Sequence, residues 1–396
     1  MALIFGSLGN TFSGIESELQ EKPVIGVINE DNGSFSNAAF SILAVNANVV
    51  FSSTNVTDKQ KGLEKLFQEK GVALIVIPKN FTQSIVNGKP GNIEIYWIMR
   101  GAGIMDSISS SVVSSILSSI NSNISQELIR NSTSINATTV LHPTLRNETT
   151  YFKSKELVGM SPERITSILS SQSTFIPIVM MMIIITAGGM VISSMALEKE
   201  NKTLETLLTL PVKRTSIVAG KIVASALVGL ILAAIYMIGL SFYMQSFQVS
   251  GETNLAAYGL TLTPQDFLLI GISLFVTLIA ALSLCMLLGI FARNYKSAQT
   301  LTFPITMLAL IPMFIIMFKD FDTLPFVLKV LVFAIPFSHP MMAPRALLFG
   351  EYPLVVAGIV YVSLFALITI IVAVRIFRTD RLITGAARKK LFFGRR

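Results

Sequence analysis

The 396-residue chain has few charged residues and one cysteine. Lys, Arg, Asp and Glu make up 14% of the sequence, whereas soluble domains contain about 25%. Hydrophobic residues make up 52%, so the composition points to a lipid bilayer as the solvent. The cysteine, Cys285, lies in an apolar run, where we expect it to be a packing residue. A lone cysteine excludes a disulfide within the chain and a cysteine-based zinc cluster.

Motifs for nucleotide binding and for metal-dependent hydrolysis are also missing. Gly220 and Lys221 lack the upstream glycine and the following hydroxyl of a phosphate-binding G-x-x-x-x-G-K-[ST] loop. There is no H-E-x-x-H, and His142 and His339 are single, so we expect ordinary surface or interface roles for them. We therefore predict a chain that is not an enzyme and that holds no cofactor or metal of its own.

Long apolar runs dominate the second half of the chain. Each is close to the roughly 20 residues that a helix needs to cross the hydrocarbon core. A shorter N-terminal run over residues 1–15 has no basic flank, and we interpret it as the outer part of an incomplete first span. The predicted fold is an α-helical polytopic membrane protein of six spans with an inserted extracellular α/β domain. The five complete runs are 175–197, 216–245, 267–291, 299–318 and 353–376.

The charges predict how these spans are oriented. Residues 16–173 carry 13 Lys and Arg against 14 Asp and Glu, whereas the remaining residues carry 18 against 9. Because the excess cations lie beside apolar spans, we interpret them as cytoplasmic membrane flanks rather than a nucleic-acid surface. Both termini are then cytoplasmic, residues 16–173 are extracellular, and residues 378–396 form a basic cytoplasmic tail. We expect a multi-pass protein of the plasma membrane.

A shorter apolar run, 326–337, contains Lys329 and ends near Pro336. If it crossed the membrane, the basic tail and the charged loop 196–215 would lie on opposite sides, against the positive-inside rule. We therefore expect a re-entrant outer segment near 320–345, within a transmembrane domain of five helices over 174–377.

The predicted outer domain, 16–173, alternates strand-like and helix-like segments, which is typical of an α/β fold. A stripe of apolar residues at every fourth position predicts a long amphipathic helix over 104–128, and polar 130–152 is expected to be a loop. Ser161 and Pro162 predict a helix start that can continue into the second span. The expected strands are 24–28, 48–53, 72–77 and 92–98, and the expected helices between them include 57–71 and 79–88.

One charged segment, 196–221, interrupts the apolar runs. Its leucines follow helical spacing, Thr203 can cap a short helix with Glu205 in its first turn, and Pro211 can end it. Two interpretations remain open on spacing alone: a helix that lies among lipid headgroups, or a helix that contacts a partner.

The predicted spans have no Asp or Glu in their central portions. Ion-coupled secondary transporters usually need ionisable groups inside the membrane, so this alternative is weakened and energy would have to come from elsewhere. A third alternative is an extracellular sensor or binding domain on a membrane anchor. Five or six spans exceed what an anchor needs.

The charged segment resembles the region after the second span in permeases of the type-2 ATP-binding cassette exporter family. The family pattern is roughly E-[RK]-E-x-G-T-L-E-x-L-L-x-x-P-[VL]-x-R, followed by G-K. Lys202 stands where the family usually has glycine. Residues 25–36 and 71–97 also resemble the family's outer domain, and 334–351 resembles its segment before the last span. The matching residues are Glu198, Glu200, Thr203, Leu204, Glu205, Leu207, Leu208, Pro211, Arg214, Gly220 and Lys221, with Arg345 in the later segment.

The resemblance implies a permease subunit of an ATP-driven exporter that works as a dimer of permease copies in the bilayer. ATP and magnesium would be bound by a separate ATPase subunit. The residues expected to couple to that ATPase are Glu198, Glu200, Thr203, Leu204, Glu205, Leu207, Leu208, Pro211 and Arg214. Pro336, Pro340 and Arg345 are expected in an outer gate segment.

Overall fold

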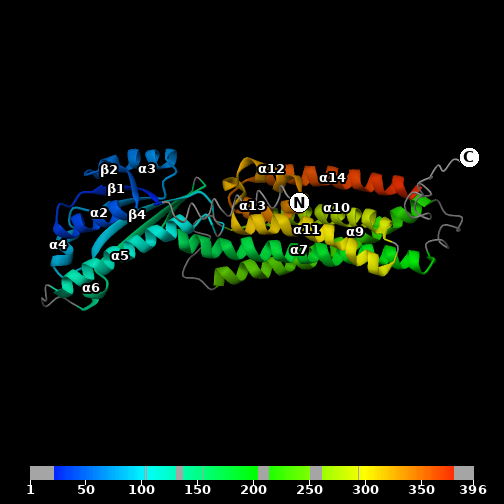
Figure 1. Cartoon of the computed structure of the whole chain (residues 1–396), viewed down its shortest axis with the longest axis horizontal. Coiled ribbons are helices and arrows are strands. Elements are labelled where there is room, and N and C mark those ends of the chain that lie inside the picture. The colour runs from blue at the N-terminus through cyan, green and yellow to red at the C-terminus, as the bar shows by residue number, and fades with distance from the viewer. Residues whose placement is uncertain are drawn as a thin grey trace, which may run out of the picture. The chain divides into compact units, whose positions relative to one another are not determined.

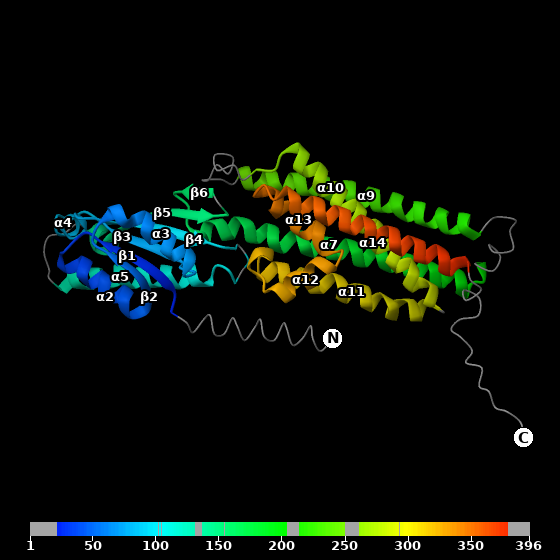
Figure 2. The same ribbon diagram turned by 90° about the horizontal axis from the view of Figure 1, so that it is seen from above.

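The computed structural model describes residues 22–101, 103, 105–130, 137–153, 155–203, 214–249, 261–292 and 294–378. The predicted partial span 1–15 and all but the first residue of the basic tail lie outside these residues. The chain divides into two compact units. The first comprises Met1–Ser171 with Phe318–Leu324, and the second comprises Gln172–Met317 with Pro325–Arg396. Figures 1 and 2 show the elements of each.

The first unit is built on a six-stranded sheet in the order β2-β1-β3-β4-β5-β6. The β1 strand is parallel to β2 and β3, and β4 is antiparallel to β3 and parallel to β5. All four strands predicted from β-branched runs are present, which confirms the α/β assignment. The strands are β1 (Val24–Asn29), β2 (Asn48–Ser53), β3 (Ala73–Ile77), β4 (Gly91–Met99), β5 (Thr144–Phe152) and β6 (Lys155–Val158).

The prediction of a loop over 130–152 is wrong. Residues Ala137–Leu141 form helix α6, and β5 pairs with β4 along its whole length. The β5 strand has no apolar alternation, and most of its side chains are partly buried or exposed. Thr150 is fully buried, and its hydroxyl donates a hydrogen bond of 2.6 Å to the Met160 carbonyl. Backbone pairing, rather than an apolar pattern, therefore defines this strand.

Three helices cover one face of the sheet: α2 (Ser34–Asn46), α4 (Phe81–Val86) and α5 (Ile108–Arg130). The predicted stripe on α5 supplies Ile116, Ile120, Ile124 and Leu128 to the core beneath it, next to the fully buried Trp97. Full burial of an aliphatic or aromatic side chain of this size contributes about 1.5–3 kcal/mol. This layer between helices and sheet therefore contributes to the unit's stability, and Figure 1 shows the three helices beside the sheet.

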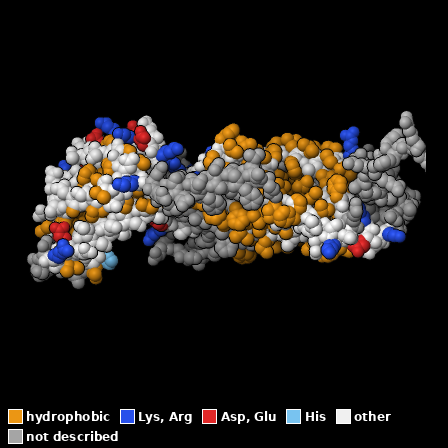
Figure 3. All heavy atoms as spheres, viewed as in Figure 1, with side chains coloured by type: hydrophobic (Ala, Val, Ile, Leu, Met, Phe, Trp, Pro, Cys, Tyr) orange, Lys and Arg blue, Asp and Glu red, His pale blue; other side chains and the backbone are white. Residues whose placement is uncertain are grey.

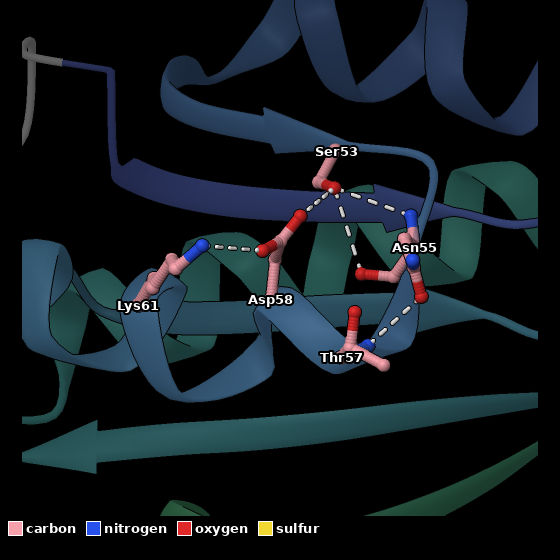
Figure 4. A network of polar contacts seen from close by, with 5 residues as sticks. All are labelled: Ser53, Asn55, Thr57, Asp58 and Lys61. Carbon is pink, nitrogen blue, oxygen red and sulfur yellow. Dashed lines mark hydrogen bonds and ion pairs between the residues drawn. The ribbon is translucent and has the colours of Figure 1, made fainter.

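The opposite face is covered by α3 (Lys59–Gln68), which packs Leu66 against Leu74 and Val76. The helix begins two residues later than predicted, because Asn55 starts a 3-10 turn by accepting a 3.1 Å hydrogen bond from the Thr57 N–H. Asp58 is the last residue of this turn and accepts a hydrogen bond from Ser53 Oγ at 2.9 Å (Figure 4). The corner between β2 and α3 is thus fixed by polar contacts.

The second unit is helical, and every long apolar run of the sequence lies in a helix. Helix α7 begins at Pro162, where the predicted cap Ser161 accepts a hydrogen bond from the Arg164 N–H. Figure 3 shows hydrophobic side chains gathered over these helices, and many are exposed. Among the described residues these helices are α7 (Pro162–Glu200, whose residues 162–171 belong to the first unit), α9 (Arg214–Val249), α10 (Pro264–Phe291), α11 (Tyr295–Phe318, whose last residue belongs to the first unit), α12 (Phe326–Ala334), α13 (Ser338–Leu348) and α14 (Tyr352–Arg378).

Among the described residues, four helical segments are long and apolar enough to cross a membrane. The α12–α13 pair, bent by 114°, is either a broken fifth span or a re-entrant loop. In α9 the apolar stretch found is the shorter Leu227–Gly239. The fold is therefore mostly helical with four or five candidate spans, and the sixth span and the sidedness remain predictions. The four segments are Ile176–Glu200, Pro264–Phe291, Tyr295–Phe318 and Tyr352–Ile376.

Glycines allow α7 and α10 to pack closely. A Cβ at Gly188 would lie 2.5 Å from the Sγ atom of Cys285, and one at Gly289 would lie 2.9 Å from the Cβ of Met195. Cys285 is fully buried in this contact. The end of α7 is thereby held against the end of α10.

Candidate functional site

The C-terminal end of α7 carries the described part of the predicted coupling segment. Glu198, Glu200 and Thr203 are described, and Arg214 is the first residue of α9. Nothing is described of the Arg214 side chain. The remaining predicted coupling residues, Leu204, Glu205, Leu207, Leu208 and Pro211, lie outside the described residues.

Lys199 binds the C-terminal end of α10. Its Nζ donates hydrogen bonds to the carbonyl of Ile290 and, at 3.2 Å, to that of Ala292. The last carbonyls of a helix have no partner within the helix and carry partial negative charge, so a cation there is stabilising. Lys199 was not among the predicted coupling residues, although the basic position between the two glutamates of the family pattern marks it.

Glu200 binds the N-terminal end of α11. Its Oε2 accepts a 2.9 Å hydrogen bond from the N–H of Tyr295, the first residue of α11. An acidic group at a helix N-terminus is favoured for the opposite electrostatic reason. We call Lys199 and Glu200 the charged clamp. Two adjacent residues of opposite charge tie the end of α7 to both helices that flank the α10–α11 turn.

The backbone conformation of Lys202 explains why the family pattern has glycine at this place. Lys202 has a φ of +57°, the left-handed conformation in which glycine is favoured, and its N–H donates to the Lys199 carbonyl at 3.1 Å. The Thr203 hydroxyl donates to the Glu198 carbonyl at 3.0 Å. These contacts end α7 in a defined turn immediately before the part of the coupling segment outside the described residues.

Glu198 faces a cavity rather than the clamp. Its Oε1 accepts a 3.4 Å hydrogen bond from Ser194 Oγ, one turn earlier on α7. The cavity has a volume of about 480 Å³ and lies between α7, α9 and α10. Its lining is Thr186, Ala187, Met190, Val191, Ser194, Met195, Glu198, Ala224, Val228, Leu232, Leu282 and Met286.

The predicted gate residues lie in and before α13. Pro336 is buried in the bend between α12 and α13, Pro340 lies in the first turn of α13, and Arg345 lies in its last turn. All residues of α13 are buried within a single chain. A gate at this position would have to move together with the helices that pack on it.

His339 explains part of that packing. Its Nε2 lies 3.0 Å from the Phe333 carbonyl oxygen, and its ring meets the Phe333 ring edge-on at a centroid distance of 4.8 Å. A Cβ at Gly358 of α14 would lie 2.6 Å from the His339 Nδ1. His339 is therefore a packing residue between α12, α13 and α14.

A second polar cluster lies in the first unit, around the segment Phe318–Leu324. Asp106 Oδ2 accepts hydrogen bonds from the N–H of Asp320 at 2.9 Å and from that of Gly103 at 3.1 Å. Lys153 Nζ lies 2.6 Å from Asp322 Oδ2 and 3.8 Å from Asp320 Oδ2. We call Asp106, Lys153, Asp320 and Asp322 the Asp106 cluster. This cluster was not predicted, because its members are far apart in the chain.

The environment of Asp106 shifts its protonation. Burial raises the pKa of Asp106 above its ordinary value, and the Asp320 carboxylate adds to the rise, whereas the hydrogen bonds that Asp106 accepts oppose it. Gly103 is needed beside this carboxylate, because a Cβ there would lie 2.5 Å from the Phe318 carbonyl oxygen. Among the residues that the structure describes, no group of His, Cys, Asp or Glu side chains is arranged to hold a metal ion.

Comparison with known proteins identifies the family. A crystallised domain assigned to an ABC type-2 transporter of Thermotoga maritima MSB8 is 26% identical, and the match covers 37% of this chain and 99% of that one with a TM-score of 0.34. No curated protein matches the chain. The model of the family described as "ABC-2 family transporter protein" matches residues 1–375. The chain is therefore a membrane component of a transporter and belongs to the ABC-2 transporter family.

Proposed function

We propose that the chain is the permease subunit of an ATP-driven exporter and works as a dimer with a separate ATPase subunit. The ATPase would bind ATP and magnesium, because the sequence contains no phosphate-binding loop. In the proposed topology, both termini and the 196–215 loop are cytoplasmic and residues 16–173 are extracellular.

The charged clamp is the observation that supports ATP coupling best. A partner that moved the segment 198–214 would also move α10 and α11, because Lys199 and Glu200 bond directly to their ends. Hydrogen bonds to charged groups contribute about 1.5–3 kcal/mol each. These bonds therefore favour movement of α10 and α11 together with the end of α7.

Docking and transmission can be tested separately by co-expressing the chain with its ATPase. Leu208→Asp is expected to abolish association with the ATPase, since it places a charge on the apolar side of the predicted helix. Lys199→Met is expected to leave association intact and to reduce transport-coupled ATP hydrolysis. Lys296→Met, a change of the same type at a neighbouring exposed lysine of α11, serves as the matched control.

Two results would contradict the proposal. If Glu205→Gln and Leu208→Asp both leave ATPase association and stimulation unchanged, the segment is not a docking element. If sealed vesicles that contain the chain transport substrate on an ion gradient without ATP, the chain is a secondary transporter.

A further inference from the structure

The cavity beside the charged clamp is of small-molecule size and open on one side, where Met190 and Val228 of its lining are 69% and 47% exposed. Its volume of about 480 Å³ falls within the range of about 300–1,000 Å³ that ligand sites usually have. Its walls come from α7, α9 and α10, three helices of the same unit. This site is separate from the predicted docking and gate residues, apart from Glu198.

Most of the lining is apolar and adaptable. Met190 and Met195 of α7 and Met286 of α10 contribute three methionines, whose unbranched side chains adjust to ligands of different shapes. The two hydroxyls are engaged within α7, since Thr186 donates to the Met182 carbonyl and Ser194 donates to Glu198. The lining therefore offers little hydrogen bonding to a polar ligand.

Glu198 supplies the one charged side chain among the lining residues that the structure describes. It is half-buried at the end of the part of α7 that lines the cavity. Its negative charge is therefore screened less by water than the charge of a fully exposed carboxylate. A carboxylate at the edge of an apolar cavity disfavours anions and favours a positive group at that edge.

We propose that this cavity binds an amphipathic organic cation, with the apolar body among the methionines and the positive group at Glu198. The inference rests on the proposed function in naming the substrate class of the exporter. Glu198 precedes the charged clamp directly in the chain. An occupant bound at Glu198 would therefore affect the neighbouring residues Lys199 and Glu200, which hold α10 and α11.

Binding can be measured without the ATPase. The purified chain is placed in phosphatidylcholine nanodiscs and titrated with tetraphenylphosphonium, with tetraphenylborate as a probe of similar shape and opposite charge. We expect saturable binding of the cation above the uptake by protein-free nanodiscs, and no saturable binding of the anion in a separate titration. Glu198→Gln should weaken cation binding roughly 10- to 100-fold, because the probe has no hydrogen-bond donor and loses its charge attraction to the carboxylate. Glu64→Gln, which removes an exposed glutamate in the other unit, should leave it unchanged.

A second variant tests the cavity independently of the charge. Met190→Trp adds a bulky side chain at the open side of the cavity and keeps Glu198, so it should also weaken saturable binding. An unchanged affinity in either variant, or cation uptake equal to that of protein-free nanodiscs, would overturn the proposal. Because neither ATP nor the ATPase is present, these outcomes are independent of whether the chain proves to be an ATP-coupled exporter.

Discussion

Replacement of Asp106 should release the segment Phe318–Leu324 from the first unit. Asp106 Oδ2 accepts the N–H groups of Asp320 and Gly103, and a second contact joins the Met105 N–H to the Phe318 carbonyl at 3.0 Å. Asp106→Ala removes the carboxylate and leaves the backbone N–H groups of Asp320 and Gly103 without this hydrogen-bond acceptor. Asp106→Asn retains a carbonyl oxygen at the same place and serves as the matched variant.

The expected effect follows from the cost of an unsatisfied buried donor, about 1–3 kcal/mol. The local opening free energy of the segment should fall by this amount, so the Asp320 amide should exchange hydrogen roughly 5- to 150-fold faster. Hydrogen–deuterium exchange of peptides that cover 318–324 measures this directly. Asp58→Asn, at the β2–α3 corner, should leave the segment unaffected. Equal protection in wild type and Asp106→Ala would refute the role of Asp106.

Wild type and Asp106→Asn should also differ in how their free energy of unfolding depends on pH. The folded state raises the pKa of Asp106, so the folded state binds its proton more tightly than the unfolded state does. The stability that Asp106 contributes is therefore present below its ordinary pKa and is lost as the pH rises through its raised value. Asp106→Asn cannot ionise, so its stability relative to wild type should increase over that pH window. A difference that is constant with pH would show that Asp106 does not titrate in this way.

The remaining predictions concern backbone conformation and helix packing. Lys202→Gly should stabilise the protein by up to about 1 kcal/mol, because the left-handed conformation costs a side-chain-bearing residue about 1–2 kcal/mol and glycine loses more entropy on folding. Thermal unfolding measures this change in stability. An equal increase in stability in Lys202→Ala would argue against backbone strain at Lys202. Gly289→Ala should destabilise by about 1–3 kcal/mol through overpacking against Met195, whereas Gly239→Ala, with no atom within 4 Å of its Cβ, should not. Equal stability of the two alanine variants would contradict the α7–α10 contact.

Apolar patterns predicted most of the fold, because burial imposes a periodicity that a sequence displays directly. The first four strands, the stripe on α5 and the helix start at Ser161 all follow from such local patterns. The β5 strand escaped prediction because its pairing is made by the backbone, which any sequence can provide. Local pattern thus predicts elements with an apolar periodicity and misses a strand such as β5, whose side chains show none.

The candidate site was predictable as a segment but not as a set of contacts. The alternating charges at 198–200 marked the segment, and the family's glycine marked the turn at Lys202. The partners of Lys199 and Glu200 lie more than ninety residues further along the chain, at the ends of α10 and α11. Such pairings depend on how helices assemble, and a single sequence does not record them.

The inclusion of Phe318–Leu324 in the first unit has a consequence for how this protein can be recombined. The unit consists of two stretches that are separated in the chain by residues 172–317. A chimera that receives the unit of a relative through residues 22–171 alone would keep the native Asp320 and Asp322 against foreign neighbours. Both stretches should therefore be exchanged together, and substitutions at Asp106 or Lys153 should covary with those at 318–324 among relatives.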